Sequence, residues 1–361
     1  MLSQLKEADP GPYLGIAGKD NKRRVFMNLS QFNRRGYVKD FTPLEKLSRL
    51  SEKLGGPDIY IKRDDLLNEL TSGGNKIRKL DFLVADALDQ GADTLITCGA
   101  VQSNHCRLTL AAAVKEGMRC RLVLEERVPN SYDPDASGNN FLFQLLGVEK
   151  VKVVPNGSDL KSEMQKVAAE VAAASRKAYI IPGGGSNEIG ATGYVSCAEE
   201  ILMQAFQQGI NFNYVVCASG SGGTHSGLLT GFEGNNSGIP VIGINVRAEK
   251  EPQEAKIHEL ANSTAAHVGV KGTILRDAVT CFDDYVGPGY SLPTEGMVEA
   301  VNLLAKTEGI LLDPVYSGKA MAGLIDLIRQ GYFKEDDNVL FVHTGGSPAL
   351  YAYQSIILNK D

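Results

Sequence analysis

Residues 76–105, KIRKLDFLVADALDQGADTLITCGAVQSNH, hold one complete unit of a pattern that repeats along the chain. Residues 76–91 have the apolar spacing of an amphipathic helix and end at a glycine. The β-branched run at 93–99 indicates a strand, which passes through a loop of small and polar residues into a second helical segment at 104–117. Strands that alternate with helices in this way are typical of parallel sheets built from crossover units.

The alternation continues on both sides of this stretch. Further strands are predicted at 58–65, 119–126, 150–155, 178–185, 213–223, 240–246, 310–318 and 338–346. Further helices are predicted at 139–147, 160–177, 192–209, 225–234, 294–309 and 321–331. So many units favour an α/β fold with two open, twisted, parallel-sheet domains, and a single barrel is the competing arrangement. Residues 1–40 are polar and irregular, and we expect an N-terminal arm there.

Composition narrows the class of protein. A chain of 361 residues is long enough for two substantial cores. The net charge of −6 gives no electrostatic reason to expect a nucleic-acid partner, and no apolar run approaches the roughly 20 residues that span a bilayer. The six cysteines are scattered, without metal-ligand spacing, and most lie in apolar runs, so we expect reduced, buried thiols and no metal. With no secretory signal pattern, a cytoplasmic protein without a membrane partner is expected.

Five loops rich in small residues are the strongest pointer to a site. They are CGAVQSNH (98–105), PGGGSNEIG (182–190), ASGSGGTHSG (218–227), DPVYSGK (313–319) and HTGGS (343–347). Each follows a predicted strand, and open α/β sheets bind ligands beyond the carboxyl ends of their strands. Small residues allow a ligand to approach the backbone closely. We therefore expect the five loops to meet at one site.

The loop at 218–227 predicts a phosphate cup. Its glycines, the amides at the start of the following helix and two hydroxyls would hold a single anion. No lysine follows the last glycine as in a Walker loop, and His225 stands where a dinucleotide fingerprint has glycine. A glycine-rich turn that only packs a helix on a strand is the alternative interpretation.

Lys76 is the candidate nucleophile, because Gly73 and Gly74 precede it at a junction between loop and helix. A lysine that forms a Schiff base must lose its proton, and burial favours that loss. Pyridoxal 5′-phosphate supplies both an aldehyde for this lysine and one phosphate for the cup. Arg78 and Lys79 on the same predicted helix are competing cations, and an ordinary solvated lysine is the alternative.

Five motifs together resemble a known family: GGNKIRKLDFL (73–83), GAVQSNHCR (99–107), GSGGTHSG (220–227), DPVYSGKAMAGLIDL (313–327) and HTGGSPAL (343–350). From about residue 42 to the C-terminus the chain is similar to fold-type II pyridoxal-phosphate enzymes, whose architecture is that of the tryptophan synthase β subunit. Within these it resembles the family of 1-aminocyclopropane-1-carboxylate deaminase and D-cysteine desulfhydrase. The resemblance implies a large domain (1–78 and 188–361), a small inserted domain (79–187), the cofactor between them, and a homodimer.

The resemblance also implies roles for individual residues. Lys76, Ser103, Tyr290 and Tyr316 are the expected catalytic residues, with Gln102 and Asn104 beside them for substrate. The expected cofactor ligands are Lys76, Asn75, Asn104, Ser219, Gly220, Ser221, Gly222, Gly223, Thr224, Ser317 and Thr344. From the residues alone, Ser103 is also compatible with a plain helix N-cap, and His225 and His343 are assigned no catalytic role.

Two positions bear on the reaction. The cyclopropane deaminases carry glutamate and leucine where this chain has Ser317 and Thr344, and a glutamate strengthens the ring as an electron sink. The hydroxyls therefore favour β-elimination of D-cysteine to pyruvate, ammonia and hydrogen sulfide.

Ring opening of the cyclopropane substrate and sulfite release from cysteate are the alternatives, with Arg107 the nearest candidate for binding the extra anion of cysteate. A non-catalytic cofactor carrier and a dinucleotide binder are alternatives from other classes. Lys76 leads as the base at Cα, with Ser103 and Tyr290 left open.

Overall fold

The computed structural model describes residues 27–67 and 69–358. Residues 1–26 of the expected N-terminal arm lie outside the described residues. Residues 27–40 are irregular apart from a short 3-10 turn at Leu29–Gln31, in agreement with the prediction for that part of the arm.

The larger sheet has six strands, in the order β1-β2-β10-β7-β8-β9. All neighbours are parallel except β1, which pairs antiparallel with β2. The strands are β1 (Leu44–Lys46), β2 (Asp58–Arg63), β10 (Asn338–His343), β7 (Tyr214–Ser219), β8 (Val241–Asn245) and β9 (Thr280–Phe282).

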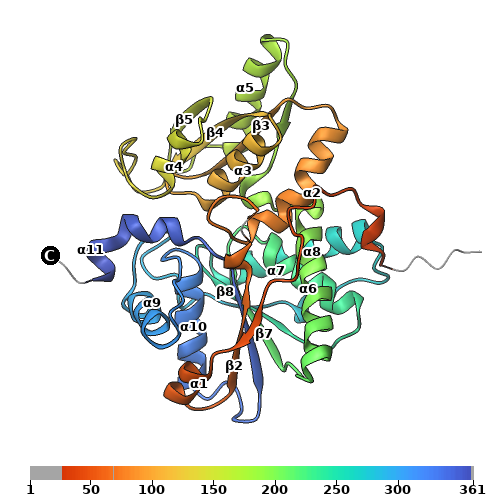
Figure 1. The fold of residues 1–361 in the computed structure, drawn as a ribbon, viewed down its shortest axis with the longest axis vertical. Coiled ribbons are helices and arrows are strands. Elements are labelled where there is room, and N and C mark those ends of the chain that lie inside the picture. The colour runs from red at the N-terminus through yellow and green to blue at the C-terminus, as the bar shows by residue number, and fades with distance from the viewer. Residues whose placement is uncertain (1–26, 68, 359–361) are drawn as a thin grey trace, which may run out of the picture.

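The smaller sheet has four parallel strands, in the order β5-β4-β3-β6. They are β5 (Lys150–Pro155), β4 (Arg119–Glu126), β3 (Thr94–Ala100) and β6 (Ala178–Ile180). Figure 1 shows this sheet and its helices as a separate lobe above the larger one. Two open, mainly parallel sheets confirm the predicted fold class and rule out the barrel. The exact domain boundaries stay a prediction.

Helices cover both faces of the larger sheet. In β10, Val339 and Phe341 pack into the core that holds α9 and α10, whereas Leu340 and Val342 pack against α6, α7 and α8. This alternation follows from the period of two in a strand and buries both faces. The helices are α1 (Ser48–Leu54), α2 (Lys76–Asp89), α3 (Asn104–Lys115), α4 (Asn139–Leu145), α5 (Leu160–Ala173), α6 (Glu188–Gln208), α7 (Gly223–Gly234), α8 (Lys250–Val268), α9 (Glu295–Glu308), α10 (Ser317–Arg329) and α11 (Gln354–Ile357).

One predicted strand is wrong. Residues 310–318 form no strand, because the carboxylate of Asp313 accepts hydrogen bonds from the backbone nitrogens of Val315 and Tyr316 and folds the segment into a turn. Pro314, which lies between Asp313 and Val315, has no N–H to give to a sheet. The helix α10 then begins at Ser317, earlier than predicted.

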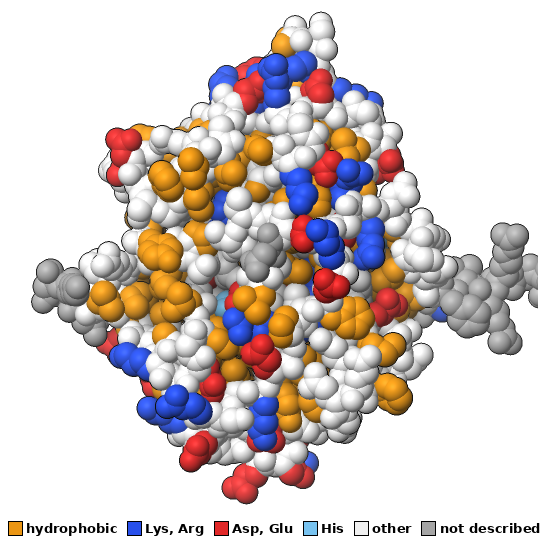
Figure 2. Space-filling view, viewed as in Figure 1, with side chains coloured by type: hydrophobic (Ala, Val, Ile, Leu, Met, Phe, Trp, Pro, Cys, Tyr) orange, Lys and Arg blue, Asp and Glu red, His pale blue; other side chains and the backbone are white. Residues whose placement is uncertain are grey.

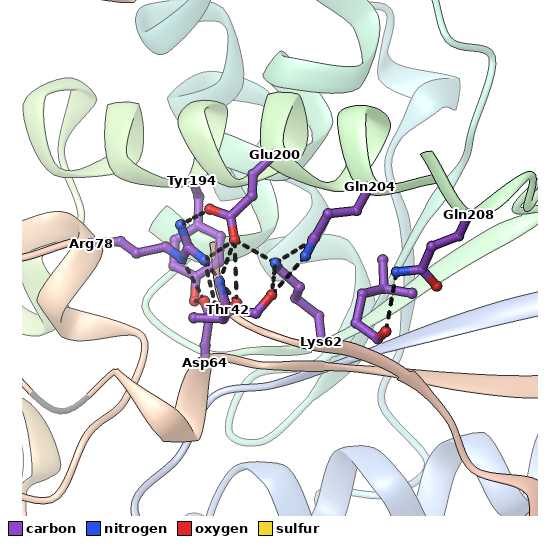
Figure 3. Close-up of polar contacts among 9 residues, drawn as sticks. Thr42, Lys62, Asp64, Arg78, Tyr194, Glu200, Gln204 and Gln208 are labelled. Atoms are coloured by element: carbon purple, nitrogen blue, oxygen red, sulfur yellow. Dashed lines mark hydrogen bonds and ion pairs between the residues drawn. The ribbon is translucent and has the colours of Figure 1, made fainter. Parts of the chain in front are cut away.

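A buried polar cluster fixes α2 against its neighbours (Figure 3). Arg78 on α2 donates to Asp64 at 2.7 Å and to Glu200 on α6 at 2.7 Å. Lys62 on β2 pairs with Glu200, and the Tyr194 hydroxyl donates to Asp64 at 2.6 Å. The two cations and two carboxylates balance, and their side chains are at most 4% exposed. The start of α2 is therefore held from two sides.

The charged surface and the state of the cysteines agree with what the composition predicts. Figure 2 shows acidic and basic side chains interspersed over one face of the molecule. Among the helices of residues 27–67 and 69–358, none is long and apolar enough to span a membrane. All six cysteines are buried and free, which confirms the expectation of reduced thiols.

Candidate active site

The five loops meet at two adjoining cavities beyond the carboxyl ends of β3, β7 and β10. The larger cavity has a volume of about 240 Å³. Each loop contributes to its wall or to that of the smaller one: Ser103, Gly183, Gly220, Tyr316 and Thr344. This confirms that the loops share one site. The predicted site residues that line it are Asn75, Lys76, Ser103, Asn104, Gly220, Ser221, Gly222, Thr224, Tyr290, Tyr316 and Thr344.

Lys76 is the first residue of α2 and lines both cavities. The loop before it is held because the backbone nitrogen of Asn75 donates to the Thr344 carbonyl at 3.0 Å. Gly74 has φ +122°, and a Cβ there would lie 3.1 Å from the same carbonyl oxygen. Burial lowers the pKa of Lys76 to about 8, with Asp313 opposing the shift. Its amine therefore loses its proton more easily than an ordinary lysine.

The phosphate cup lies between β7 and α7. Gly222 has φ +104°, which glycine adopts without strain, and the Thr224 hydroxyl accepts a hydrogen bond from the Asn75 side chain at 2.9 Å. Lys79 adds a buried amine: its Nζ donates to the Gly184 carbonyl at 3.1 Å and would lie 2.9 Å from a Cβ placed on Gly223. Sequence reasoning treated Lys79 as a competitor of Lys76. Lys79 lies three residues after Lys76, so both lie on one face of the helix. This spacing could have indicated that both face the site.

Ser103 and Asn104 begin α3 and face the cavities. The Ser103 Oγ accepts from the backbone nitrogen of Cys106 at 3.1 Å, so it caps the helix. The Asn104 Nδ2 donates to Asp313 Oδ2 at 3.0 Å, and its Oδ1 accepts from Asn139 at 2.9 Å. Sequence reasoning did not single out Asp313, although it lies in a quoted motif. Burial raises the pKa of Asp313 to about 6.

Two tyrosines and an arginine line the larger cavity. The hydroxyls of Tyr290 and Tyr316 are hydrogen-bonded to each other, and their rings meet edge to face with centroids 5.7 Å apart. Burial raises the pKa of both, so both stay protonated. The guanidinium carbon of Arg127 lies 4.2 Å from the centroid of the Tyr290 ring. Arg127 was not predicted, and it belongs to no glycine-rich motif.

Four predicted site residues do not line either cavity: Gln102, Ser219, Gly223 and Ser317. The side-chain amide of Gln102 binds the 137–139 segment, with Asn139 N donating to its Oε1 at 2.8 Å. The Ser219 hydroxyl accepts from Gln253 at 2.9 Å, and the Ser317 hydroxyl accepts from the Asp313 backbone nitrogen at 2.8 Å. The Gly223 nitrogen donates to the Ser186 hydroxyl at 3.1 Å. Their roles toward ligands stay predictions.

Arg107 and His343, which were also discussed from the sequence, do not line either cavity. Arg107, the candidate for an extra substrate anion, is fully buried and donates to Asn139 at 2.7 Å and to the Gly73 carbonyl at 3.2 Å. It is therefore not a cavity residue, and that expectation is wrong. His343 is buried with its Nε2 3.0 Å from the Leu311 carbonyl, in keeping with a structural role.

Pyridoxal 5′-phosphate agrees with the groups present. The predicted cup would offer backbone amides, two hydroxyls and the Lys79 amine to one phosphate. His105 lines both cavities beside these donors. Within the described part of the chain, no three His, Cys, Asp or Glu side chains gather as metal ligands. The amides, hydroxyls and amine of the cup suit one phosphate group.

Comparisons with known proteins agree with this geometry. Residues 38–345 match the model of the family described as pyridoxal-phosphate dependent enzyme. A D-cysteine desulfhydrase of Yersinia enterocolitica is 47% identical over 90% of this chain and 97% of its own length, and one of Serratia proteamaculans is 44% identical over the same shares. A solved structure described as an ACC deaminase homologue superposes with a TM-score of 0.83 at 37% identity, covering 93% of this chain and 99% of that one.

Proposed function

This chain belongs to the family of pyridoxal-phosphate dependent enzymes, and from this membership we propose that it is a lyase that releases hydrogen sulfide from D-cysteine. The observation that carries the choice of reaction is the chemistry at positions 317 and 344. Thr344 lines the smaller cavity and Ser317 is held by the Asp313 backbone, so neither position offers a carboxylate to the cofactor ring. A ring without that partner withdraws fewer electrons, which suits loss of a thiolate better than opening of a cyclopropane.

Lys76 would hold the cofactor and then handle the substrate proton. Bound pyridoxal 5′-phosphate supplies an aldehyde that condenses with amines and a ring that withdraws electrons from Cα. A pKa of about 8 allows the Lys76 Nζ to bind covalently near neutral pH. The same nitrogen would also be placed to take the proton from Cα of the substrate.

The start of α3 would orient the substrate. The Ser103 Oγ accepts from Cys106 N at the start of α3, and the first amides of α3 point out of the helix end. A substrate carboxylate there would receive charge-assisted hydrogen bonds. Asn104, fixed by Asp313 and Asn139, would hold the cofactor ring beside it.

The tyrosine pair would serve the leaving group. Tyr290 and Tyr316 stay protonated, and one hydroxyl of the pair is free to donate beyond their mutual hydrogen bond. A donor there would protonate the departing sulfur. D-cysteine and water then give pyruvate, ammonia and hydrogen sulfide.

A parallel assay tests the proposal. The cofactor-loaded protein is incubated with D-cysteine, L-cysteine and 1-aminocyclopropane-1-carboxylate, and sulfide, pyruvate and 2-oxobutanoate are measured. We expect sulfide and pyruvate in equal amounts from D-cysteine. Release of 2-oxobutanoate from the cyclopropane substrate without sulfide from either cysteine would contradict the proposal.

We further propose that the enzyme is a cytoplasmic homodimer with a small amino acid as its partner. Six free, buried cysteines support a reducing compartment. Apolar side chains exposed near the C-terminus, Tyr351 at 66% and Leu358 at 50%, support a subunit contact there. Light scattering on the purified protein gives the subunit number, and a monomeric mass would refute the dimer.

A further inference from the structure

The tyrosine pair comes from two segments that the fold brings together. Tyr290 lies in the loop at 283–294, between β9 and α9, and Tyr316 lies in the turn that precedes α10. Their hydroxyls are hydrogen-bonded to each other, and their ring planes are inclined by 72°. This arrangement requires the loop to be fixed relative to the turn, because a shift of about 1 Å in a reacting group can remove most of the rate. The contacts that fix the loop therefore bear on the reaction.

Lys319, in the first turn of α10, connects the two segments. Its Nζ donates to the carbonyl of Val286 at 2.6 Å and to the carbonyl of Gly289 at 2.9 Å. Lys319 lies three residues after Tyr316, and Gly289 is the residue immediately before Tyr290. One amine therefore ties the segment that carries one tyrosine to the loop that carries the other.

Packing alone does not explain a lysine at this position. The Lys319 side chain is fully buried, and within residues 27–67 and 69–358 no carboxylate pairs with it. Burial lowers the pKa of Lys319 to about 8, so its surroundings disfavour the charged form. A buried cation without a counter-charge costs free energy, and an apolar side chain of similar length avoids that cost. The two hydrogen bonds to the loop are the contribution that an apolar residue could not make.

A second side chain holds the same loop. The hydroxyl of Tyr353, at the end of the 3-10 turn Ser347–Tyr353, donates to the Ser291 carbonyl at 2.7 Å. Ser291 has φ +64°, in the left-handed region that residues other than glycine seldom adopt. The carbonyls of the residues on either side of Tyr290, Gly289 and Ser291, are thus both held by side chains from outside the loop.

We propose that Lys319 and Tyr353 are positioning residues for Tyr290, which they hold in place to protonate the leaving group. This inference rests on the proposed function, in which the tyrosine pair is the proton donor. Neither Lys319 nor Tyr353 lines either cavity, so each acts through Tyr290 and not on the substrate. The Cβ–S bond breaks with both electrons on sulfur, the sulfur takes a proton from a hydroxyl of the pair, and solvent water returns that proton.

A double-mutant cycle on the cofactor-loaded enzyme tests the positioning role. Sulfide release from D-cysteine is measured for wild type, Lys319→Met, Tyr290→Phe and the double variant. We expect each single variant to lower kcat about tenfold or more, with little change in KM. The double variant should be no slower than Tyr290→Phe, because a misplaced hydroxyl and a missing hydroxyl lose the same proton donor.

Two matched variants each remove one hydroxyl from a contact of this loop. Tyr353→Phe removes the bond to the Ser291 carbonyl. Tyr285→Phe, five residues before Tyr290, removes a hydrogen bond of 2.8 Å to Asp326. We expect Tyr353→Phe to lower kcat about threefold or more and Tyr285→Phe to leave it unchanged.

A spectroscopic measurement on Tyr290 needs no catalysis. The cofactor-free protein is prepared with 3-fluorotyrosine in place of Tyr290, and its fluorine NMR resonance is recorded. We expect this resonance to shift or split in Lys319→Met and in Tyr353→Phe, because the loop is no longer held in one position, and to stay in place in Tyr285→Phe. If Lys319→Met does not fold, Tyr353→Phe takes its place in the double-mutant cycle.

The remaining outcomes decide against the proposal or against the proposed function. If the losses of Lys319→Met and Tyr290→Phe multiply in the double variant, the lysine acts independently of Tyr290 and the proposal is overturned. An unchanged resonance in Lys319→Met overturns it as well, and so does a loss of kcat in Tyr285→Phe as large as in Tyr353→Phe. If wild-type enzyme releases no sulfide from D-cysteine, the proposed function is wrong, and the resonance alone then decides whether the two residues position Tyr290.

Discussion

The side-chain amide of Asn104 donates to the carboxylate of Asp313 across a distance of 3.0 Å and so joins the start of α3 to the turn before α10. Asp313 is fully buried, and its Oδ1 already accepts from the backbone nitrogens of Val315 and Tyr316. Its Oδ2 is thus left for Asn104. One carboxylate therefore shapes the turn that carries Tyr316 and orients the amide beside the cavity.

Asp313→Asn should change how stability depends on pH. Burial raises the pKa of Asp313 to about 6, so between about pH 4 and pH 6 the folded protein keeps a proton that the unfolded chain has lost. The wild type therefore loses free energy of unfolding as pH rises through this window, by about 2–3 kcal/mol from this group, and the variant does not. Urea unfolding of the cofactor-free proteins at pH 4 and pH 7 checks this. The prediction would be refuted if wild type and variant differed in free energy of unfolding by the same amount at pH 4 and at pH 7.

Gly345→Ala should disturb the loop that precedes Lys76. Gly345 has φ +74°, and a Cβ there would lie 2.7 Å from the Gly74 Cα, two residues before Lys76. Gly331 is the control, with φ +72° and no atom within 4 Å of its added Cβ. We expect Gly331→Ala to cost about 1–2 kcal/mol of stability from the backbone alone, and Gly345→Ala to cost about 1–3 kcal/mol more and weaken cofactor binding. Equal effects of the two variants on melting temperature and cofactor binding would show that the contact is unimportant.

Arg78→Met should destabilise the protein strongly although Arg78 lies outside both cavities. The change leaves Asp64 and Glu200 buried with only Lys62 to balance them (Figure 3). Breaking such a cluster costs about 3–5 kcal/mol. Arg329→Met, which breaks an exposed pair with Glu299, should cost under about 1 kcal/mol. Chemical denaturation measures both, and similar values would mean that the buried cluster contributes no more than a surface pair.

Lys79→Met should weaken cofactor binding while leaving the cofactor-free protein at least as stable. Burial lowers the pKa of Lys79 well below its usual value, with Lys76 adding to the shift, so the cation is unfavourable until an anion occupies the cup. We expect the Kd for pyridoxal 5′-phosphate to rise about tenfold or more, from the loss of a charge-assisted contact. Lys166→Met, at a side chain that is 61% exposed, should leave the Kd unchanged. An unchanged Kd in Lys79→Met would place the phosphate elsewhere.

Much of the fold was predictable because its units repeat. Helices and strands with a clear apolar period, such as α3 and β4, were predicted close to their observed bounds. No comparable apolar period marks α8, because its buried face includes Gln253 and Thr264 beside Ile257 and Ala261. β1 and β9 have three residues each, too few to show alternation.

The site was predictable where the chemistry sits within a motif. The positions of Lys76, Ser103 and Gly220 at the cavities could be predicted because glycines and hydroxyls mark loops that bind ligands. Arg127 and Arg247 could not, since each is an ordinary charged residue in sequence and only the folding of β4 and β8 toward a common cavity brings them together. Ser317 belongs to a quoted motif, but its hydroxyl accepts from the Asp313 backbone nitrogen. Its position in the sequence does not reveal this contact.

Covalent attachment of the cofactor to Lys76 is the central claim, and mass spectrometry tests it most directly. A preparation shown to release sulfide is reduced with borohydride, digested, and analysed peptide by peptide. The account predicts that the reduced pyridoxal phosphate is found on the peptide that contains Lys76, at the Nζ of that residue. An active preparation in which this peptide is unmodified, or in which the cofactor is found on Lys79 or another lysine, would contradict it.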